Sequence, residues 1–333
     1  MAHKTRHRPR PGFTLQINHV PPPNPPPHPT SILVIGAGEL GTAILSALTT
    51  HPNNNHTSNT TTTTKIAVLR RASTLASPDP AQQSAIARLA SLGITSETGD
   101  FIHSPLPELI AVFAKYNVVI QAGGYGAPGG TLLRVAEAAV AAGVRVFVPW
   151  QFGVDYAAVS AADQQGGGGG GLEASGHGEL FGEMLAVRAM LRGQNGTRWV
   201  VVSTGLFMSF LFLRGFGAVD LEGKVLRGLG GWGNRVTVTD VDGIGRMVAE
   251  VVYQPPDGNV VYVAGDTVSY GEVADIVEGV YGGGFKREVW DREYLRKRLE
   301  EEPEDLMLKY QNAFAAGVGY VKENKNRLTE SAD

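Results

Sequence analysis

The chain has 333 residues, of which 43% are hydrophobic and none is cysteine, and its formal net charge is -3. This composition is typical of a globular protein with a sizeable core, and the lack of cysteine excludes disulfides, thiolate metal sites and cysteine nucleophiles. The small negative charge gives no reason to expect a nucleic-acid partner, and no pattern in the chain predicts a metal site.

The N-terminal arm, residues 1–29, combines basic residues with a proline-rich block at 21–29. No apolar segment follows the basic residues, which argues against a secretory signal, and the prolines prevent the long amphipathic helix of an organelle-targeting peptide. We expect a disordered, polyproline-like arm. The apolar run 199–213 is shorter than the roughly 20 residues that a membrane span needs, so we expect a cytoplasmic protein that does not enter a membrane.

The first predicted strand is the apolar run 32–35, which leads into three glycines and an amphipathic helix. Gly36 permits a tight turn, Gly38 lets the backbone approach a pyrophosphate, and Gly41 lets the helix pack close to the sheet. The helix N-terminus then offers N–H groups to phosphates. The alternative is a glycine-rich turn that binds nothing. The residues predicted to hold a dinucleotide here are Gly36, Gly38, Glu39, Leu40 and Gly41.

A polar low-complexity segment, residues 51–64, is predicted as a solvated insertion. The second strand, 65–69, ends at Arg70 and Arg71. Without the insertion Arg70 lies about 20 residues after Gly36, at the usual distance of the residue that reads the ribose. No acidic residue is present there, and two guanidinium groups suit a 2′-phosphate. We therefore predict NADPH (NADP) rather than NAD(H); the alternative is a solvated arginine pair.

Strands and helices continue to alternate along the chain. The predicted helices are 81–92, 105–115 and 131–142, and the predicted strands are 94–97, 118–122 and 145–149. This order predicts an α/β fold with a doubly wound parallel sheet that binds its ligand at the carboxyl ends of the strands. Gly123 and Gly124 follow one strand there, where glycine lets the backbone lie against the adenosine half of a cofactor.

The segment after the fifth strand is the expected nicotinamide side of the site. Trp150, Gln151 and Phe152 are predicted to bind the cofactor. Asp155 and Tyr156 are candidates for proton transfer, although an aspartate in a loop is more often a turn or cap residue. A further candidate, His177, lies beyond a hexaglycine that indicates a second insertion at 164–178.

The C-terminal part is predicted to return to the sheet and to form a substrate pocket. The predicted helices are 180–191, 241–252 (capped by Asp240), 270–281 (capped by Ser269) and an exposed, charged helix over 290–309; the strands are 199–203, 236–239 and 260–264. Aromatic residues after the sixth strand suit a flat, apolar ligand, although at least half of them should be plain core. The predicted pocket residues are Phe152, Phe207, Met208, Phe210 and Trp232. We divide the chain into the arm 1–29, a cofactor domain 30–205 and a substrate region 206–333, with 236–253 returning to the cofactor core.

Several blocks of the chain carry a family resemblance. They are the glycine fingerprint at 36–41, Arg70, Val-Pro-Trp-Gln-Phe-Gly-Val-Asp at 148–155, the segment 181–188, Trp-Val-Val-Val-Ser-Thr-Gly-Leu-Phe at 199–207 and Thr-Asp-Val-Asp-Gly-Ile-Gly at 239–245. Together they resemble the NmrA-like and isoflavone-reductase-like family of atypical short-chain dehydrogenases, specifically its fungal members. The resemblance implies a Rossmann domain with a smaller C-terminal substrate region. It also implies NADPH-dependent reduction of aromatic, phenylpropanoid-like or polyketide compounds, and monomers or homodimers.

The chain departs from the family at its best catalytic candidate. The family's reductases place a lysine in the pattern F-x-x-K-x-x-V-R, where this chain has Met184. A thioether cannot donate a proton, and the Tyr-x-x-x-Lys pair of short-chain dehydrogenases is also absent because position 160 is Ser160. Hydride transfer needs no protein acid, since that chemistry belongs to the cofactor. Water, Asp155, Tyr156 or His177 remain as proton sources.

Two hypotheses follow from these observations. The first is an NADPH-dependent oxidoreductase acting on an aromatic or polyketide-type secondary metabolite. The second, motivated by Met184, is a non-catalytic regulator of the NmrA type that senses NADP(H) and binds a protein partner. An isomerase or cyclase that uses the same pocket without net redox change is a third, lesser alternative.

Overall fold

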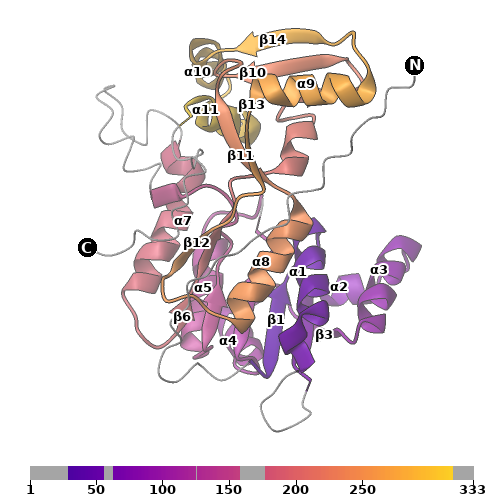
Figure 1. Cartoon of the computed structure of the whole chain (residues 1–333). Coiled ribbons are helices and arrows are strands. Elements are labelled where there is room, and N and C mark those ends of the chain that lie inside the picture. Colours follow the sequence, from indigo (N-terminus) through magenta and orange to yellow (C-terminus); the bar gives the residue numbers. More distant parts are fainter. Residues whose placement is uncertain (1–28, 56–62, 125, 158–176, 318–333) are drawn as a thin grey trace.

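Figure 1 shows a computed structural model of the protein, which describes residues 29–55, 63–124, 126–157 and 177–317. The expected arm up to residue 28, the hexaglycine, Ser160 and parts of both predicted insertions lie outside the described residues. Within the described part of the chain, no helix has the length and apolar character needed to cross a bilayer.

A six-stranded sheet with the order β3-β2-β1-β4-β5-β6 positions the site. Its strands, all paired in parallel, are β1 (Ser31–Ile35), β2 (Lys65–Arg70), β3 (Thr95–Thr98), β4 (Val118–Gln121), β5 (Val146–Val148) and β6 (Arg198–Trp199). The predicted strand 199–203 is divided at Val200, because its second piece, β7 (Val201–Ser203), pairs with β12 (Val260–Tyr262) instead. The strand order reverses between β1 and β4, which places the ligand-binding switch point there.

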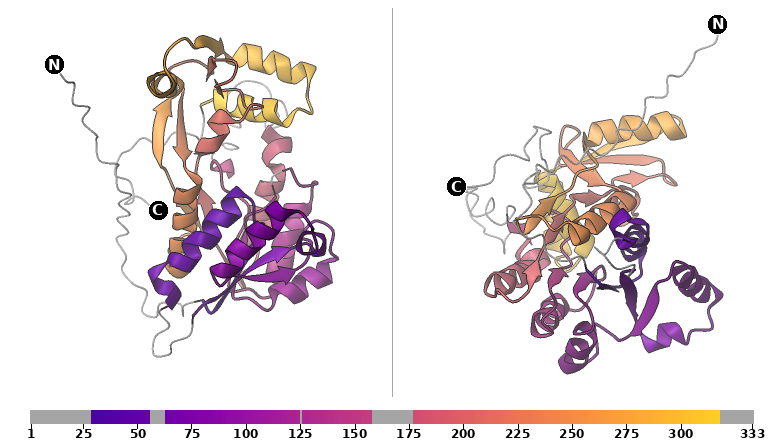
Figure 2. Two further views of the ribbon diagram at one scale, coloured as in Figure 1. Left: turned by 90° about the vertical axis from the view of Figure 1, so that its right-hand side faces the viewer. Right: turned by 60° about the horizontal axis from the view of Figure 1, so that its bottom comes forward.

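Helices cover both faces of the sheet, which confirms the doubly wound α/β fold (Figures 1 and 2). On one face lie α1 (Glu39–Thr50), α3 (Pro80–Ser91) and α8 (Val241–Tyr253), and on the other α4 (Leu106–Phe113), α5 (Thr131–Ala141) and α7 (His177–Arg192). Alternate residues of β1 point to opposite faces. Ile32 and Val34 join the core beside α1, and Leu33 and Ile35 join the core beside α5.

The C-terminal part forms two small sheets and three helices at the top of Figure 1. One sheet contains β14 (Lys286–Trp290), β10 (Val225–Leu229) and β9 (Val219–Asp220), and the other contains β13 (Asp266–Ser269), β11 (Arg235–Thr239) and β8 (Leu206–Phe207). The helices are α9 (Tyr270–Tyr281), α10 (Arg292–Glu301) and α11 (Leu306–Ala315), and the short helical turn η2 (Met208–Phe212) follows β8. Two further short turns, η1 (Pro52–Asn55) and α2 (Ala72–Leu75), belong to the part that carries the central sheet. Asp240 and Ser269 cap α8 and α9 as predicted.

Two predictions about surface segments were wrong. The charged segment 290–309 is not one exposed helix but the end of β14, the helix α10 and the start of α11, and α11 buries Leu308 and Phe314. The polar segment at 51–64 is not solvated throughout. Its His51 stacks on Tyr253 with ring centroids 4.5 Å apart, because the segment begins against the end of α8.

Candidate functional site

The glycine turn between β1 and α1 lies at the switch point of the sheet. A Cβ on Gly36, whose φ is +97°, would lie 3.1 Å from the backbone of Gly123, and one on Gly41 would lie 2.1 Å from the carbonyl oxygen of Gly36. A Cβ on Gly38 would meet no described atom within 4 Å. Packing within the chain therefore requires glycine at 36 and 41, whereas at 38 only a closely approaching ligand would require it.

The first turn of α1 is open to an anion. Its N-cap residue is Gly38, which has no side chain to accept hydrogen bonds from the first N–H groups. Leu40 is buried in the core beside α1, so it could contribute only its backbone to a ligand, and Glu39 is exposed. The positive end of the helix dipole and the free N–H groups together suit a phosphate.

The second glycine pair closes the turn from the other side of the switch point. A Cβ on Gly123 would lie 3.3 Å from the ring of Phe101. Gly124 has a φ of +150°, and a Cβ there would lie 2.6 Å from Leu132 and 3.2 Å from Trp150. The bare backbone at these two positions therefore packs against its own chain as well as lining the predicted cofactor site.

Arg70 and Arg71 point to different surroundings. Arg70 is only 8% exposed, and its Nε and Nη2 atoms have no hydrogen-bond partner in the described part of the chain. Burial lowers the pKa of Arg70. Arg71 is exposed at the start of α2. Unsatisfied donors on a buried cation are costly, and an anionic ligand would satisfy those of the Arg70 guanidinium.

The segment after β5 places the side chain of Gln151, a predicted cofactor contact, inside the protein. Gln151 is 1% exposed, and its Nε2 atom donates to the carbonyl oxygen of Met184 at 2.9 Å while its Oε1 atom accepts from Arg188 Nε at 2.5 Å. Both ends of the amide are therefore used within the protein. Trp150 and Phe152, in contrast, lie with ring centroids 5.8 Å apart, and Trp150 is partly exposed.

The candidate proton donors Asp155 and Tyr156 are both held by structural contacts. Asp155 accepts from Arg188 Nη1 at 2.8 Å and from the Tyr262 hydroxyl. Tyr156 is 5% exposed and packs on Phe181, and burial raises its pKa well above the ordinary value. These contacts give both side chains structural roles, and proton transfer by either of them stays a prediction.

Of the two remaining catalytic positions, the structure describes the side chain of Met184. His177 begins α7, and its side chain lies outside the described residues. Met184, at the position of the family's lysine, is 8% exposed within the core beside α5 and α7.

The predicted pocket aromatics are only partly brought together. Phe207 and Phe210 lie with ring centroids 6.2 Å apart at the start of η2. Phe152 is buried in the core beside α1, against which Phe207 also packs. Trp232 lies beneath Arg287 and beside α9, and its place in a pocket with Phe207 stays a prediction.

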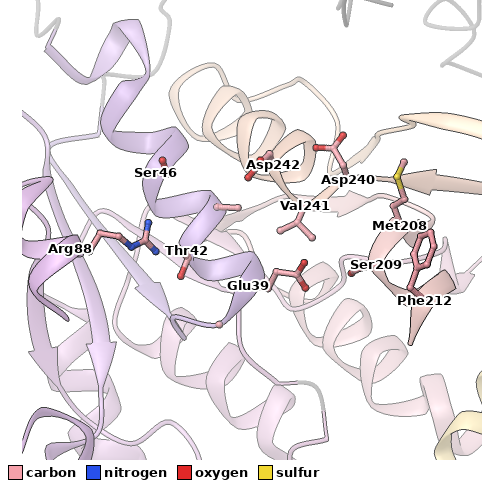
Figure 3. Close-up of a pocket in the computed structure, with 12 residues that line it drawn as sticks. Glu39, Thr42, Ser46, Arg88, Met208, Ser209, Phe212, Asp240, Val241 and Asp242 are labelled. Atoms are coloured by element: carbon pink, nitrogen blue, oxygen red, sulfur yellow. The ribbon is translucent and has the colours of Figure 1, made fainter. Parts of the chain in front are cut away.

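An open cleft of about 710 Å³ lies beside the glycine turn (Figure 3). It lies between α1, α3, η2 and the start of α8, and its lining includes Gly38, Glu39, Thr42, Arg88, Met208, Ser209, Phe212, Asp240 and Asp242. Sequence reasoning identified Asp240 only as a helix cap and did not single out Arg88, Ser209 or Asp242. The three carboxylates occupy helix starts, where the dipole stabilises them. The described residues contain no group of three or more acidic or histidine side chains that could hold a metal.

Known proteins similar to this chain were found by sequence and by structure. No family model matches the chain. An NmrA-like family domain-containing oxidoreductase of Gibberella moniliformis is 44% identical over 302 residues, which are 90% of this chain and 92% of the relative. A crystal structure of isoflavone reductase matches with a TM-score of 0.65 and 18% identity over 86% of each chain. The structure of AtPrR2 with NADP+ and (+)pinoresinol matches with a TM-score of 0.61 and 19% identity, again over 86% of each chain.

Proposed function

This chain belongs to the NmrA-like family, and we propose that it is an NADPH-dependent oxidoreductase that reduces an aromatic or polyketide-type metabolite. The relative that is 44% identical is described as an oxidoreductase, and AtPrR2, which shares the fold, was crystallised with NADP+ and an aromatic compound. The family expected from the motif blocks is thereby confirmed. The substrate class and catalysis by this chain are the proposal.

Two observations carry the cofactor assignment: a Cβ on Gly38 would meet no described atom within 4 Å, and buried Arg70 has two nitrogens, Nε and Nη2, without a partner among the described residues. The pyrophosphate would be held at Gly38 and the first turn of α1, and the 2′-phosphate at Arg70 with Arg71 beside it. The nicotinamide half would extend toward Trp150 in the segment after β5, and when bound the cofactor supplies the hydride.

Proton delivery in this proposal does not use the family's lysine position. Met184 is buried and Asp155 is ion-paired, so neither offers a free proton. The cleft beside Gly38 is open to solvent and contains the hydroxyls of Thr42 and Ser209. Water entering this cleft is therefore the proton source that the arrangement supports best.

A turnover assay tests the proposed activity. The protein is mixed with NADPH and a panel of aromatic enones, ketones and benzylic ethers, and the loss of cofactor absorbance is followed. We expect turnover of at least one class. Tight NADPH binding without turnover across the whole panel would contradict the proposal.

That outcome would instead favour the second candidate, a regulator that senses NADP(H). The buried Met184 at the lysine position is the observation that supports it. A regulator should bind a protein partner with an affinity that differs between NADP+ and NADPH, whereas identical capture of the partner with both cofactor forms would count against it.

The 2′-phosphate assignment predicts the effect of replacing both arginines. Arg70→Ser with Arg71→Ser should weaken NADPH binding by about 1–3 kcal/mol, since charged hydrogen bonds are lost, and leave NADH binding nearly unchanged. Calorimetric titration with both cofactors measures this difference. Arg292→Ser, at an exposed position at the start of α10, is the control and should leave the binding of both cofactors unchanged. Equal weakening of NADPH and NADH by the double variant would show that the phosphate lies elsewhere.

A further inference from the structure

A polar cluster with a buried centre at Gln151 and Arg188 and an exposed edge at Tyr262 ties the segment after β5 to α7 and β12. We name it the clasp; its members are Gln151, Asp155, Arg188 and Tyr262. Arg188 on α7 is 1% exposed and bonds to both clasp residues of the segment after β5. Its Nε donates to Gln151 Oε1 at 2.5 Å and its Nη1 to Asp155 Oδ1 at 2.8 Å. The hydroxyl of Tyr262 on β12 donates to the other carboxylate oxygen of Asp155.

The clasped segment is also fixed from a third side. The carbonyl oxygen of Gly153, midway between the two Arg188 contacts, accepts hydrogen bonds from the N–H groups of Thr204 at 2.8 Å and Gly205 at 3.0 Å. It accepts a third from the Ser203 hydroxyl at 2.9 Å. The segment is thus attached to α7, to the end of β7 and to β12, which leaves it little freedom to move.

The clasp lies directly beside the predicted nicotinamide side of the site. Trp150 precedes Gln151, and its indole is the neighbour that a Cβ on Gly124 would approach to 3.2 Å. Phe152 follows Gln151, and its ring meets that of Trp150 edge to face. The two aromatic residues therefore flank Gln151 in the sequence, and Arg188 sets the orientation of the Gln151 side-chain amide.

The polar composition of the clasp suggests what it is for. An ion pair taken out of water contributes little net stability compared with apolar packing of similar volume. A guanidinium does, however, hold two acceptors in one rigid geometry, which a flexible apolar side chain cannot do. The buried Arg188 is thus better suited to fixing the position of the segment than to strengthening the core.

We propose that Arg188 is a positioning residue that, through Gln151 and Asp155, holds Trp150, which packs edge to face on the buried Phe152, where it binds the nicotinamide half of the cofactor. The inference rests on the proposed function, and it separates the site into two halves under independent control. Gly38 and Arg70 hold the phosphates of the adenosine half, and the clasp sets the nicotinamide half.

Two probes distinguish these halves. NADPH contains both, whereas adenosine 2′,5′-bisphosphate carries the adenosine phosphates without the nicotinamide. In calorimetric titrations of the full chain, Arg188→Met should weaken NADPH binding about tenfold, the loss of roughly one charged hydrogen bond's worth of affinity, and change adenosine 2′,5′-bisphosphate binding less than about twofold. Arg188→Lys, which keeps the charge but not the fork, should recover only part of the NADPH affinity.

Two further variants keep the test decisive if Arg188→Met does not fold. Asp155→Asn keeps the shape of the side chain and should weaken NADPH binding less than Arg188→Met does, again with little change in the binding of adenosine 2′,5′-bisphosphate. Arg70→Ser should weaken the binding of both probes. Equal loss of both probes in the clasp variants, or no loss of NADPH affinity in a folded clasp variant, would overturn the positioning role alone. Failure of the unmodified protein to bind either probe would overturn the proposed function together with this inference.

Discussion

At the scale of the residue, identical side chains in this site differ by what surrounds them. Gly36 and Gly41 face their own chain at close range, while Gly38 faces open space. Arg70 is buried without a partner for two of its nitrogens among the described residues, while its neighbour Arg71 is exposed. A sequence motif names such positions as one set, but each makes a separate, measurable contribution.

The glycine turn gives a matched pair of substitutions. Gly41→Ala should destabilise the fold, by about 1–3 kcal/mol as for other overpacked sites, because the new Cβ would lie 2.1 Å from the carbonyl oxygen of Gly36. Gly38→Ala should leave the free energy of unfolding nearly unchanged and weaken NADPH binding. Urea unfolding and calorimetric titration of both variants measure the two effects. Normal NADPH affinity in folded Gly38→Ala would contradict the pyrophosphate assignment.

Tyr262 gives the stability a dependence on alkaline pH. Burial, the hydrogen bond to Asp155 and the charge of Asp155 raise the pKa of Tyr262 to about 12 from its ordinary value of 10.0. Because the folded state holds this proton more tightly than the unfolded state, its stabilising contribution is complete below pH 10 and is lost as the pH rises through about 12.

The Tyr262→Phe variant isolates this contribution from that of the other tyrosines. The difference in free energy of unfolding between the unmodified protein and Tyr262→Phe should be constant from about pH 7 to 9 and shrink above pH 10. Urea unfolding followed by circular dichroism across this range measures it. A difference that is the same at pH 7 and pH 11.5 would mean that the hydroxyl of Tyr262 does not bond to Asp155 in solution.

At the scale of the element, the crossing of α1 and α8 holds the glycine turn in place. The two helices lie side by side on one face of the sheet (Figure 2), and a Cβ on Gly245 would lie 2.7 Å from the backbone of Ala43. Both helices begin at the carboxyl edge of the sheet, so their spacing sets the width of the cleft between Glu39 and Asp242.

Gly245→Ala should therefore destabilise the protein by about 1–3 kcal/mol, because backbone atoms of α1 must move to accept the methyl group. Gly279→Ala on α9 is the control, since a Cβ there would meet no described atom within 4 Å. The control should stabilise the protein by about 0.5–1 kcal/mol through the lower entropy of its unfolded chain. Thermal or urea unfolding of both variants measures the contrast, and a neutral Gly245→Ala would show that the helices are farther apart in solution.

At the scale of the whole molecule, the central sheet and the C-terminal part share one core. The apolar cluster beside α5 includes Leu33 and Ile35 of β1 and continues to Leu295 of α10 and Phe314 of α11. Phe314 is 5% exposed and meets the ring of Phe216 with centroids 5.7 Å apart. A division into a cofactor domain and a substrate region is thus a division of role within a continuous core.

A continuous core predicts a single cooperative unfolding transition. Phe314→Ala, although distant in sequence from the glycine turn, should lower the free energy of unfolding by about 3–5 kcal/mol and shift the whole transition. Differential scanning calorimetry with and without NADPH measures this. Two separate transitions, with only one shifted by Phe314→Ala, would indicate that 30–205 and 206–333 fold independently.

The sequence by itself determined the features that depend on neighbours along the chain. The apolar run 32–35, the glycine spacing and the helical repeats predicted the order of strands and helices along the chain, because such periodicities record which face of an element is buried. The caps Asp240 and Ser269 were predicted for the same reason, since a cap acts on N–H groups two or three residues away.

Only the tertiary structure decided the contacts between residues that are far apart in sequence. The contacts of Arg188 with Gln151 and Asp155, the stacking of Arg287 on Trp232, and the burial of the charged α11 segment each depend on how whole elements pack. Residue type specifies what a side chain can bond, whereas packing selects which of many candidate partners it meets. The sequence identified the glycine turn, whereas the cleft beside it and the clasp that holds the segment after β5 are seen only in the tertiary structure.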